Sequence, residues 1–288
     1  MRERRHIPGV LTREDPAGDR LPLVFDSPHS GTVYPADFAP AAPASLLRLS
    51  EDFQVDRLFA AAPEHGAVLI AAEFPRIYID PNRGSDDIDP LLLAGDWPGA
   101  LAPTGKSRLG VGLIWRLVGP ATPIYLQPLS VAAVERRLEA YYRPYHAELQ
   151  AALDAAHDRF GSTWHIDCHS MPSVAGPQSA DAGRQRPDFT VSDLDGTSCE
   201  PAFINLVVET LHSFGYDARI NDPYKGAELI RRHGRPGETR HSLQIEVNRR
   251  LYMDEQRVEL HGGFVRLQQD VTKLIAAIAG YVRGRLHL

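Results

Sequence analysis

The chain has 288 residues, 43% of them hydrophobic, and a formal net charge of −6. This length and apolar content allow a substantial core, and the acidic balance excludes an electrostatic case for nucleic acid, so we expect a small molecule as partner. Two cysteines without a Cys-x-x-Cys pair argue against a disulfide framework. The charged start has no apolar signal-peptide core and no apolar run could span a membrane, so we expect a cytoplasmic protein with one domain over residues 1–288.

Strand and helix patterns alternate in the first part of the chain, where we expect strands at 21–25, 67–71 and 76–79 and a helix at 46–65. The first strand runs into a turn-rich loop that carries His29, which either has a chemical role or only caps the turn. Glu51, Asp52 and Asp56 fall in the first turns of the predicted helix, where acids suit the helix dipole even without a function.

Arg83 follows the third predicted strand. Its planar guanidinium suits a carboxylate, although an Asp80–Arg83 contact that only stabilises the turn is the alternative. Residues 84–112 are rich in Gly, Pro and Asp and predict a long irregular insertion.

The clearest helix pattern covers residues 130–159, where apolar residues recur at helical spacing. Pro144 lies inside this pattern and predicts a kink or a break. His146 on the same helix is interpreted as a structural residue.

Residues 164–172 form a strand-like stretch that ends in Asp, Cys, His and Ser. Alternation puts His165, Asp167 and His169 on one face and their apolar neighbours on the other. Polar groups thus gather at the carboxyl end of a predicted strand, where open α/β sheets bind their ligands.

Further strands are expected at 189–194, 216–220 and 242–247, and helices at 201–214 and 263–282. Glu246 lies near the end of the third of these strands. An acid at such a position is costly unless it is paired or functional.

Several predicted elements therefore deliver ionisable groups to one sheet edge, namely His29, Asp52, Arg83, His169 and Glu246. Two histidines and one carboxylate are a common catalytic zinc set that leaves a position open for water or substrate. A nearby Glu can accept the proton of that water, and an Arg can hold an anionic substrate group.

The stretch 164–172 also offers three rival sites. His165 and His169 have the spacing of a helical zinc-protease motif, but the Glu after the first His is absent and the residues favour a strand. Ser170 lacks the Gly-x-Ser-x-Gly elbow of a serine hydrolase. Cys168 would lie on the face opposite His169.

Taken in order, these motifs resemble the N-formylglutamate amidohydrolase family. The resemblance runs from about residue 21 to residue 255, and it is carried by Ser27–Gly31, Tyr78–Arg83, Tyr145–His146, Asp167–Met171, Asn221–Gly226, Gln244–Arg249 and Leu251–Glu255. It implies an α/β fold, a three-layer αβα sandwich with a mixed, mostly parallel central sheet, similar to zinc carboxypeptidases and to zinc amidases of peptidoglycan.

The resemblance also implies roles for individual residues. His29 and His169 would bind Zn²⁺ with a third ligand at the start of the first helix, for which we choose Asp52 over Glu51 and Asp56. Glu246 would be the general base and acid. The residues expected at the substrate are Arg83, Asn82 and Asn248, and Asp167 would orient a ligand or make an ordinary strand-end hydrogen bond.

The reaction implied is zinc-dependent hydrolysis of the amide bond of a small anionic N-acyl amino acid, N-formyl-L-glutamate first, to give formate and L-glutamate. The insertion at 84–112 is where pocket shape can differ, so larger acyl groups remain open. The alternatives are a zinc peptidase or peptidoglycan-type amidase on the same scaffold, and a metal-free protein that binds an acidic ligand through Arg83.

Overall fold

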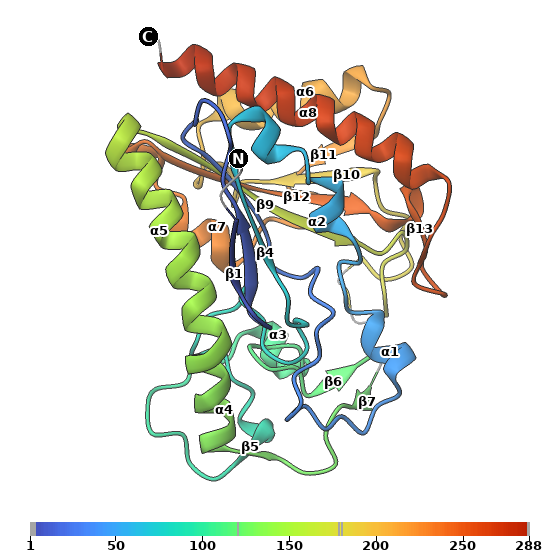
Figure 1. The fold of residues 1–288 in the computed structure, drawn as a ribbon. Helices are drawn as coiled ribbons and strands as arrows, with labels where there is room; N and C mark the ends of the chain where they lie inside the picture. The colour runs from blue at the N-terminus through green and yellow to red at the C-terminus, as the bar shows by residue number, and fades with distance from the viewer. Residues whose placement is uncertain (1–3, 120, 178, 180, 287–288) are drawn as a thin grey trace.

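An eight-stranded mixed sheet forms the centre of the fold in the computed structural model, which describes residues 4–119, 121–177, 179 and 181–286 (Figure 1). Across the sheet the strands lie in the order β1 (Arg4–Ile7), β2 (Leu11–Glu14), β4 (Val68–Ala72), β3 (Leu23–Ser27), β9 (Thr163–Met171), β12 (Arg240–Asn248), β10 (Phe189–Ser192) and β11 (Ala218–Ile220). The four middle strands are mutually parallel, and β2 and β10 pair antiparallel to them. Their carboxyl ends therefore meet at one edge, as expected for an α/β fold with a mixed, mostly parallel sheet.

Helices cover both faces of this sheet and make three layers (Figure 1). On one face lie α2 (Val55–Leu58), α6 (Pro201–Ser213) and α8 (Gly263–Leu286), and on the other α5 (Arg143–Phe160) and α7 (Glu228–His233). Strand alternation explains the division. Trp164, Ile166 and Cys168 of β9 are buried in the apolar cluster under α8, whereas the histidines between them face the opposite side.

The helix expected at 130–159 is irregular just before Pro144. Ser130 caps α4 (Val131–Arg137) by accepting a hydrogen bond from the Ala133 amide, and a π-helical turn over Leu138–Tyr142 leads into α5. Pro144 is the second residue of α5, directly after the π-helical turn, and it has no N–H to continue the backbone hydrogen bonds of the helix. The helical run is thus continuous from Val131 to Phe160, so the helix does not break at Pro144, and the irregularity before it is a π-helical turn.

Two expected elements are absent at their predicted positions. The helix expected at 46–65 is instead α1 (Ala44–Arg48), α2 and a 3-10 turn at Ala62–His65, with Gln54 in the left-handed region (φ 61°) before α2. The strand expected at 76–79 is a turn, because the Tyr78 amide donates to the carbonyl of Pro75 at 2.9 Å. In both cases the spacing of apolar residues predicted a longer regular element than the chain forms. The elements β1, β2 and α7 were not predicted from the sequence.

Between β4 and α4 the chain leaves the sheet and builds a separate region below its carboxyl edge (Figure 1). It holds a 3-10 turn at Pro90–Leu92 and the short elements β5 (Leu93–Ala94), α3 (Gly105–Arg108), β6 (Leu117–Val118), β7 (Thr122–Pro123) and β8 (Leu129–Ser130). A small hairpin, β13 (Met253–Asp254) and β14 (Glu259–Leu260), follows β12. In the described part of the chain, no helix combines the length and apolar content of a membrane span.

Candidate active site

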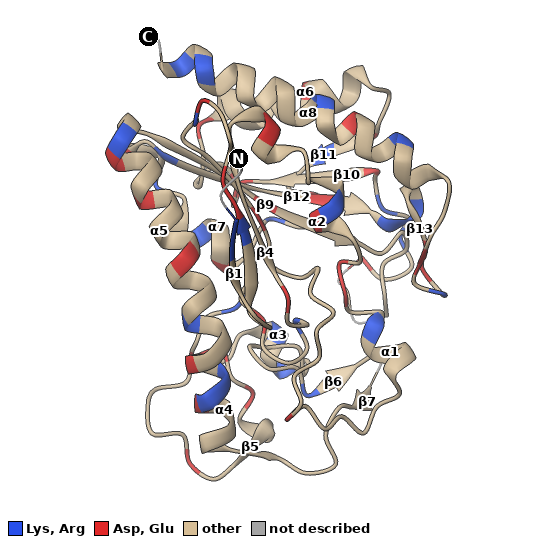
Figure 2. Cartoon of the chain, in the orientation of Figure 1, with Lys and Arg blue, Asp and Glu red and all other residues tan. Residues whose placement is uncertain are grey.

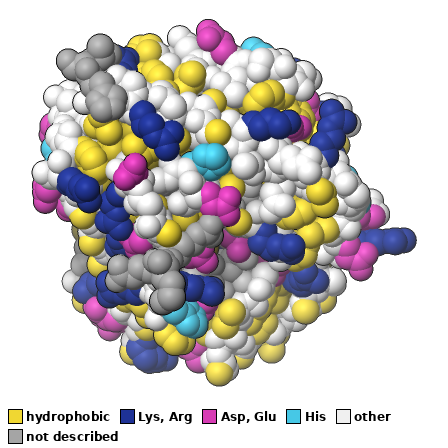
Figure 3. All heavy atoms as spheres, turned by 45° about the horizontal axis from the view of Figure 1, so that its top comes forward, with side chains coloured by type: hydrophobic (Ala, Val, Ile, Leu, Met, Phe, Trp, Pro, Cys, Tyr) yellow, Lys and Arg dark blue, Asp and Glu magenta, His cyan; other side chains and the backbone are white. Residues whose placement is uncertain are grey.

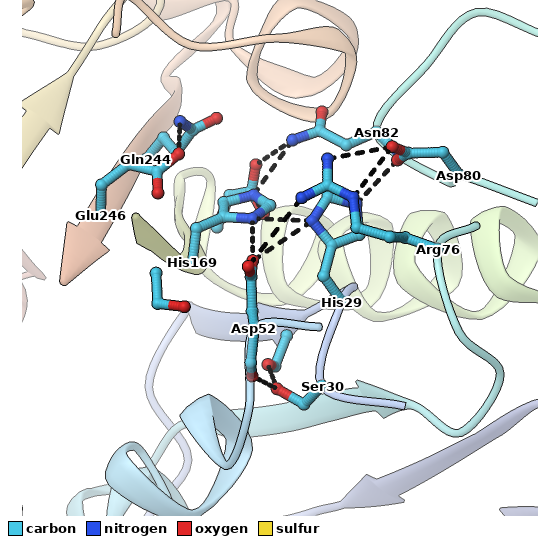
Figure 4. Close-up of polar contacts among 12 residues, drawn as sticks. His29, Ser30, Asp52, Arg76, Asp80, Asn82, His169, Gln244 and Glu246 are labelled. Atoms are coloured by element: carbon cyan, nitrogen blue, oxygen red, sulfur yellow. Dashed lines mark hydrogen bonds and ion pairs between the residues drawn. The ribbon is translucent and has the colours of Figure 1, made fainter. Parts of the chain in front are cut away.

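Three buried side chains converge beyond the carboxyl edge of the sheet. His29 follows β3, His169 lies near the end of β9, and Asp52 sits between α1 and α2 (Figure 4). Nδ1 of His29 is 3.0 Å from Nδ1 of His169, and Asp52 Oδ2 lies 3.0 Å from His169 Nδ1 and 3.3 Å from His29 Nδ1. Their candidate ligand atoms all lie within 4.8 Å of one another.

The far side of each imidazole ring faces a buried carboxylate. His29 Nε2 lies 2.7 Å from Asp80 Oδ1, and His169 Nε2 lies 2.7 Å from Asp167 Oδ1. If each Nε2–H donates to its carboxylate, both Nδ1 atoms present lone pairs to the same point. Carboxylates in this position commonly fix the tautomer and ring orientation of metal-binding histidines.

These contacts fit a divalent metal such as zinc. Zinc with bonds of about 2.0–2.1 Å in tetrahedral geometry holds neighbouring ligand atoms roughly 3.3 Å apart, close to the 3.0, 3.0 and 3.3 Å observed. Two imidazoles and one carboxylate are also the donor set of catalytic zinc sites. A cation at this point would remove the repulsion between the two facing lone pairs.

Asp52 is held ionised by its neighbours. With no cation bound, burial acts to raise the pKa of Asp52, but hydrogen bonds donated by His169 and His29 outweigh it and keep this pKa well below its ordinary value. Its other oxygen, Oδ1, accepts a hydrogen bond from Arg249 at 3.0 Å. The carboxylate thus has one oxygen directed at the histidines and one fixed by a guanidinium.

Glu246 stands beside this cluster on the neighbouring strand. It is the parallel-strand partner of His169, so the two side chains share a face of the sheet (Figure 4). Its Oε1 accepts a hydrogen bond from Gln244 at 2.9 Å. Burial raises the pKa of Glu246, and the charge of Asp52 adds to the effect against the opposing charges of His169 and Arg76. A buried carboxyl with a raised pKa is suited to exchange protons near neutral pH.

A cavity of about 310 Å³ opens over these groups, a size that suits a small ligand. His29, His169 and Glu246 line it, together with Arg83 from the region below the sheet. Asp167 is fully buried behind His169. Five of the residues predicted from the sequence, these four lining residues and Asn82, therefore lie around one cavity.

Two predicted substrate contacts are used inside the protein. Asn82 lines the cavity, but its Nδ2 donates to Asp167 Oδ2 at 3.1 Å and its Oδ1 accepts from the amide of Leu229 at 2.9 Å. Asn248 is fully buried, and its Nδ2 donates to the carbonyls of Arg186 and Pro187. Among the described residues that line the cavity, Asn248 does not occur. The side chain of Asn248 lies on the same face of the sheet as that of Glu246, two residues earlier on β12. β12 ends at Asn248, however, and the chain leaves the sheet there.

The other acids considered for the third ligand have different partners. Glu51 Oε1 accepts a hydrogen bond from the hydroxyl of Tyr34 at 2.8 Å. The Asp56 amide donates to Ser30 Oγ, and neither acid belongs to the converging group found among the described residues. The geometry favours Asp52.

The rival nucleophiles have structural contacts instead. Ser170 Oγ accepts a hydrogen bond from Arg249 Nε at 3.0 Å. Cys168 is fully buried among apolar side chains, and burial raises the pKa of its thiol well above the ordinary value. His165 is buried and has a hydrogen-bond partner at each ring nitrogen, since Nδ1 lies 2.7 Å from Ser242 Oγ and Nε2 lies 2.8 Å from Asp26 Oδ1.

Several residues that support the site were not identified from the sequence. Asp80 was considered only as a turn residue, but it contacts His29 and accepts hydrogen bonds from Arg76 at 3.0 and 3.2 Å. Gln244 and Arg249 are the ends of a motif that carries the family resemblance, but the sequence assigns neither of them a role. Their roles depend on contacts between distant segments, for which the sequence gives no local signal.

Figure 3 draws one face of the molecule with its side chains coloured by type. On the face drawn in Figure 3, the basic and acidic side chains of the described residues are interspersed, and no extended basic patch forms there.

Residues 21–253 match the family described as N-formylglutamate amidohydrolase. The chain is 30% identical over 240 residues to an N-formylglutamate deformylase of Pseudomonas putida, covering 82% of this chain and 83% of the relative. It is 31% identical over 241 residues to an N-formylglutamate deformylase of Pseudomonas aeruginosa, covering 82% and 84%. It is also similar to the crystal structure of an N-formylglutamate amidohydrolase from Ralstonia eutropha, with 51% identity, a TM-score of 0.91 and coverage of 96% of this chain and 99% of that one.

Proposed function

The chain belongs to the N-formylglutamate amidohydrolase family, whose members cleave carbon–nitrogen bonds, and from this premise we propose that it hydrolyses N-formyl-L-glutamate to formate and L-glutamate with zinc as its metal. The observation that carries the proposal is the position of Glu246, which lines the same cavity as His29 and His169, the two histidines that converge with Asp52. A base beside a candidate metal site is the arrangement that amide hydrolysis needs.

In the proposed mechanism, His29, Asp52 and His169 hold the metal. When bound, zinc supplies Lewis acidity to the acyl carbonyl and to a water molecule. Glu246 accepts the proton of the attacking water and then passes it to the leaving nitrogen as the C–N bond breaks. The hydroxyl goes to the formyl carbon, so the products are formate and the free amino acid.

Other parts of the chain prepare these groups. Asp80 and Asp167 orient the two imidazole rings through their Nε2 atoms, and Gln244 holds one oxygen of Glu246. Arg83, which lines the cavity, binds a substrate carboxylate. A cavity of about 310 Å³ supports a small acyl group, and the cytoplasmic location inferred from the sequence stays a prediction.

The test uses purified full-length protein, treated with chelator and then reconstituted with zinc. We expect about one zinc per chain, formate release from N-formyl-L-glutamate, and loss of that activity on chelation. Activity on peptides without activity on N-formyl amino acids would support the peptidase alternative instead. Ligand binding without turnover, unchanged by metal removal, would support the metal-free binding protein.

A further inference from the structure

Five cationic side chains line the active-site cavity, and they differ in whether an acid neutralises them. They are Arg76, Arg83, Lys106, Lys225 and Arg249. Three of them form ion pairs at 2.9–3.0 Å, and their partners are Asp80 for Arg76, Asp195 for Lys225 and Asp52 for Arg249. The charges of these three are therefore already balanced by the protein.

Arg83 and Lys106 remain without an ion pair to any acid that the structure describes. Arg83 donates from Nε to the carbonyl of Val111 and from Nη1 to the carbonyl of Asn82, which fixes the plane of its guanidinium. Its Nη2 has no hydrogen-bond partner among the described residues. Glu246 faces the same cavity, yet no ion pair joins it to either cation in the described part of the chain.

Lys106 is held at the cavity by the region below the sheet. It lies in α3, whose position is fixed because Asp87 accepts hydrogen bonds from the amide and hydroxyl of Thr104 and from the hydroxyl of Ser107. Figure 2 shows the basic residues of this short helix beside the loops under the sheet. Desolvation by the surrounding cavity lowers the pKa of Lys106, and the charge of Arg83 lowers it further, as expected for two cations that share a site without an acid between them.

Resting on the proposed function, we propose that Lys106 binds the side-chain carboxylate of the substrate while Arg83 binds its α-carboxylate, so that the pair selects dianionic N-formyl amino acids. Each unpaired cation then gains one carboxylate, and the ligand supplies the two negative charges that the cavity lacks.

The assignment of the two carboxylates follows from depth. The α-carboxylate lies on the carbon that carries the scissile nitrogen, so it must bind near Glu246, where Arg83 is partly buried and fixed. A side-chain carboxylate lies farther along the substrate. Lys106 is exposed and also lines two neighbouring hollows of the surface, so it stands at the mouth of the cavity, where that longer arm ends.

The test compares kcat/KM for N-formyl-L-glutamate and N-formyl-L-glutamine, which have nearly the same shape and differ by one charge. We expect wild type to prefer the glutamate compound and Lys106→Met to lose roughly 10- to 100-fold on it, while the glutamine compound is nearly unaffected. Lys225→Met is the matched control, because Lys225 lines the same cavity but is paired with Asp195. It should keep the wild-type ratio.

A binding measurement separates this inference from the proposed function. Titration calorimetry of the zinc-loaded protein with L-glutamate and L-glutamine should show that Lys106→Met weakens only L-glutamate. If wild type hydrolyses N-formyl-L-glutamate and Lys106→Met has the same ratio of kcat/KM for the glutamate and glutamine compounds as wild type, only the role of Lys106 is overturned. Absence of hydrolysis of either compound by wild type would overturn the proposed function, and equal binding of L-glutamate by Lys106→Met would then overturn the inference as well.

Discussion

Replacing Asp80 by Asn tests whether the carboxylate behind His29 tunes the candidate metal site. Asp80 is fully buried, and its Oδ1 lies 2.7 Å from His29 Nε2 and accepts a hydrogen bond from the Asn82 amide at 2.9 Å. In Asp80→Asn one oxygen can still accept both hydrogen bonds, so the tautomer of His29 is retained. The negative charge is lost, and a donor now faces Arg76, 3.0 Å from the original Oδ2.

The expected result is weaker metal binding with the site still assembled. Loss of such an orienting partner typically costs 10- to 100-fold in metal affinity, which corresponds to about 1.4–2.7 kcal/mol. Competition with a chromogenic zinc chelator measures this change in dissociation constant. Unfolding of the metal-free protein should also become easier, because Arg76 loses its buried partner, and a melting curve of that form measures the stability separately.

Asp89→Asn is the matched control. Asp89 is also buried and paired with an arginine, Arg116, at 2.6 Å, but it does not belong to the converging histidine and aspartate cluster. This variant should lose stability while keeping its zinc affinity. A dissociation constant for zinc in Asp80→Asn equal to that of Asp89→Asn would refute the reasoning, because both variants remove a buried acid and only one removes an acid from His29.

Three further predictions concern proton transfer and protonation. Glu246→Gln should lower kcat by roughly 10²- to 10⁴-fold and leave zinc affinity near that of wild type, since its carboxyl moves protons and does not join the metal cluster; parallel loss of zinc would contradict this role. Gln244→Met removes the hydrogen bond that favours ionised Glu246, so the acidic limb of the kcat/KM profile should move to higher pH, and an unmoved limb would exclude a positioning role for Gln244. Burial, with the charge of Arg232, lowers the pKa of His146 to about 3, below the value of about 6.5 in an unfolded chain. The neutral side chain of His146 therefore contributes fully to the free energy of unfolding above pH 6.5, and this contribution falls as the pH drops toward 3. Denaturant unfolding at pH 7 and pH 5 should therefore show a fall that is smaller in His146→Gln, by up to about 2 kcal/mol; equal falls would contradict the prediction.

The sheet could be predicted because burial on two faces leaves a strong apolar signal. The stretches around β3, β4, β9 and β12 read as strands, and alternation along β9 correctly separated its histidines from the apolar core. The prediction of one helix at 46–65 was wrong because three short helical segments have nearly the apolar spacing of one long helix. The strands β1 and β2 were not predicted because their charged residues, exposed in β1 and half-buried in β2, hide the pattern.

Those residues of the candidate site that lie at the carboxyl ends of strands could be predicted from the sequence. His29, His169 and Glu246 lie at such ends, and the choice of Asp52 agrees with the observed convergence. Asp80 could not be assigned in the same way, because its contact with His29 joins segments 51 residues apart and the intervening chain shows no periodic pattern. Supporting contacts of this kind are fixed by tertiary packing and not by local sequence.

The register of β9 and β12 has a consequence for how this protein can change. Because His169 and Glu246 are direct partners across two hydrogen-bonded strands, backbone pairing sets their separation, and a slip of one residue would turn Glu246 toward the apolar layer. Arg83 and Lys106 belong instead to the region outside the sheet, where insertions and substitutions leave that pairing intact. Engineering of acyl or side-chain preference can therefore be confined to residues 83–119, while the reactive geometry is inherited unchanged from the sheet.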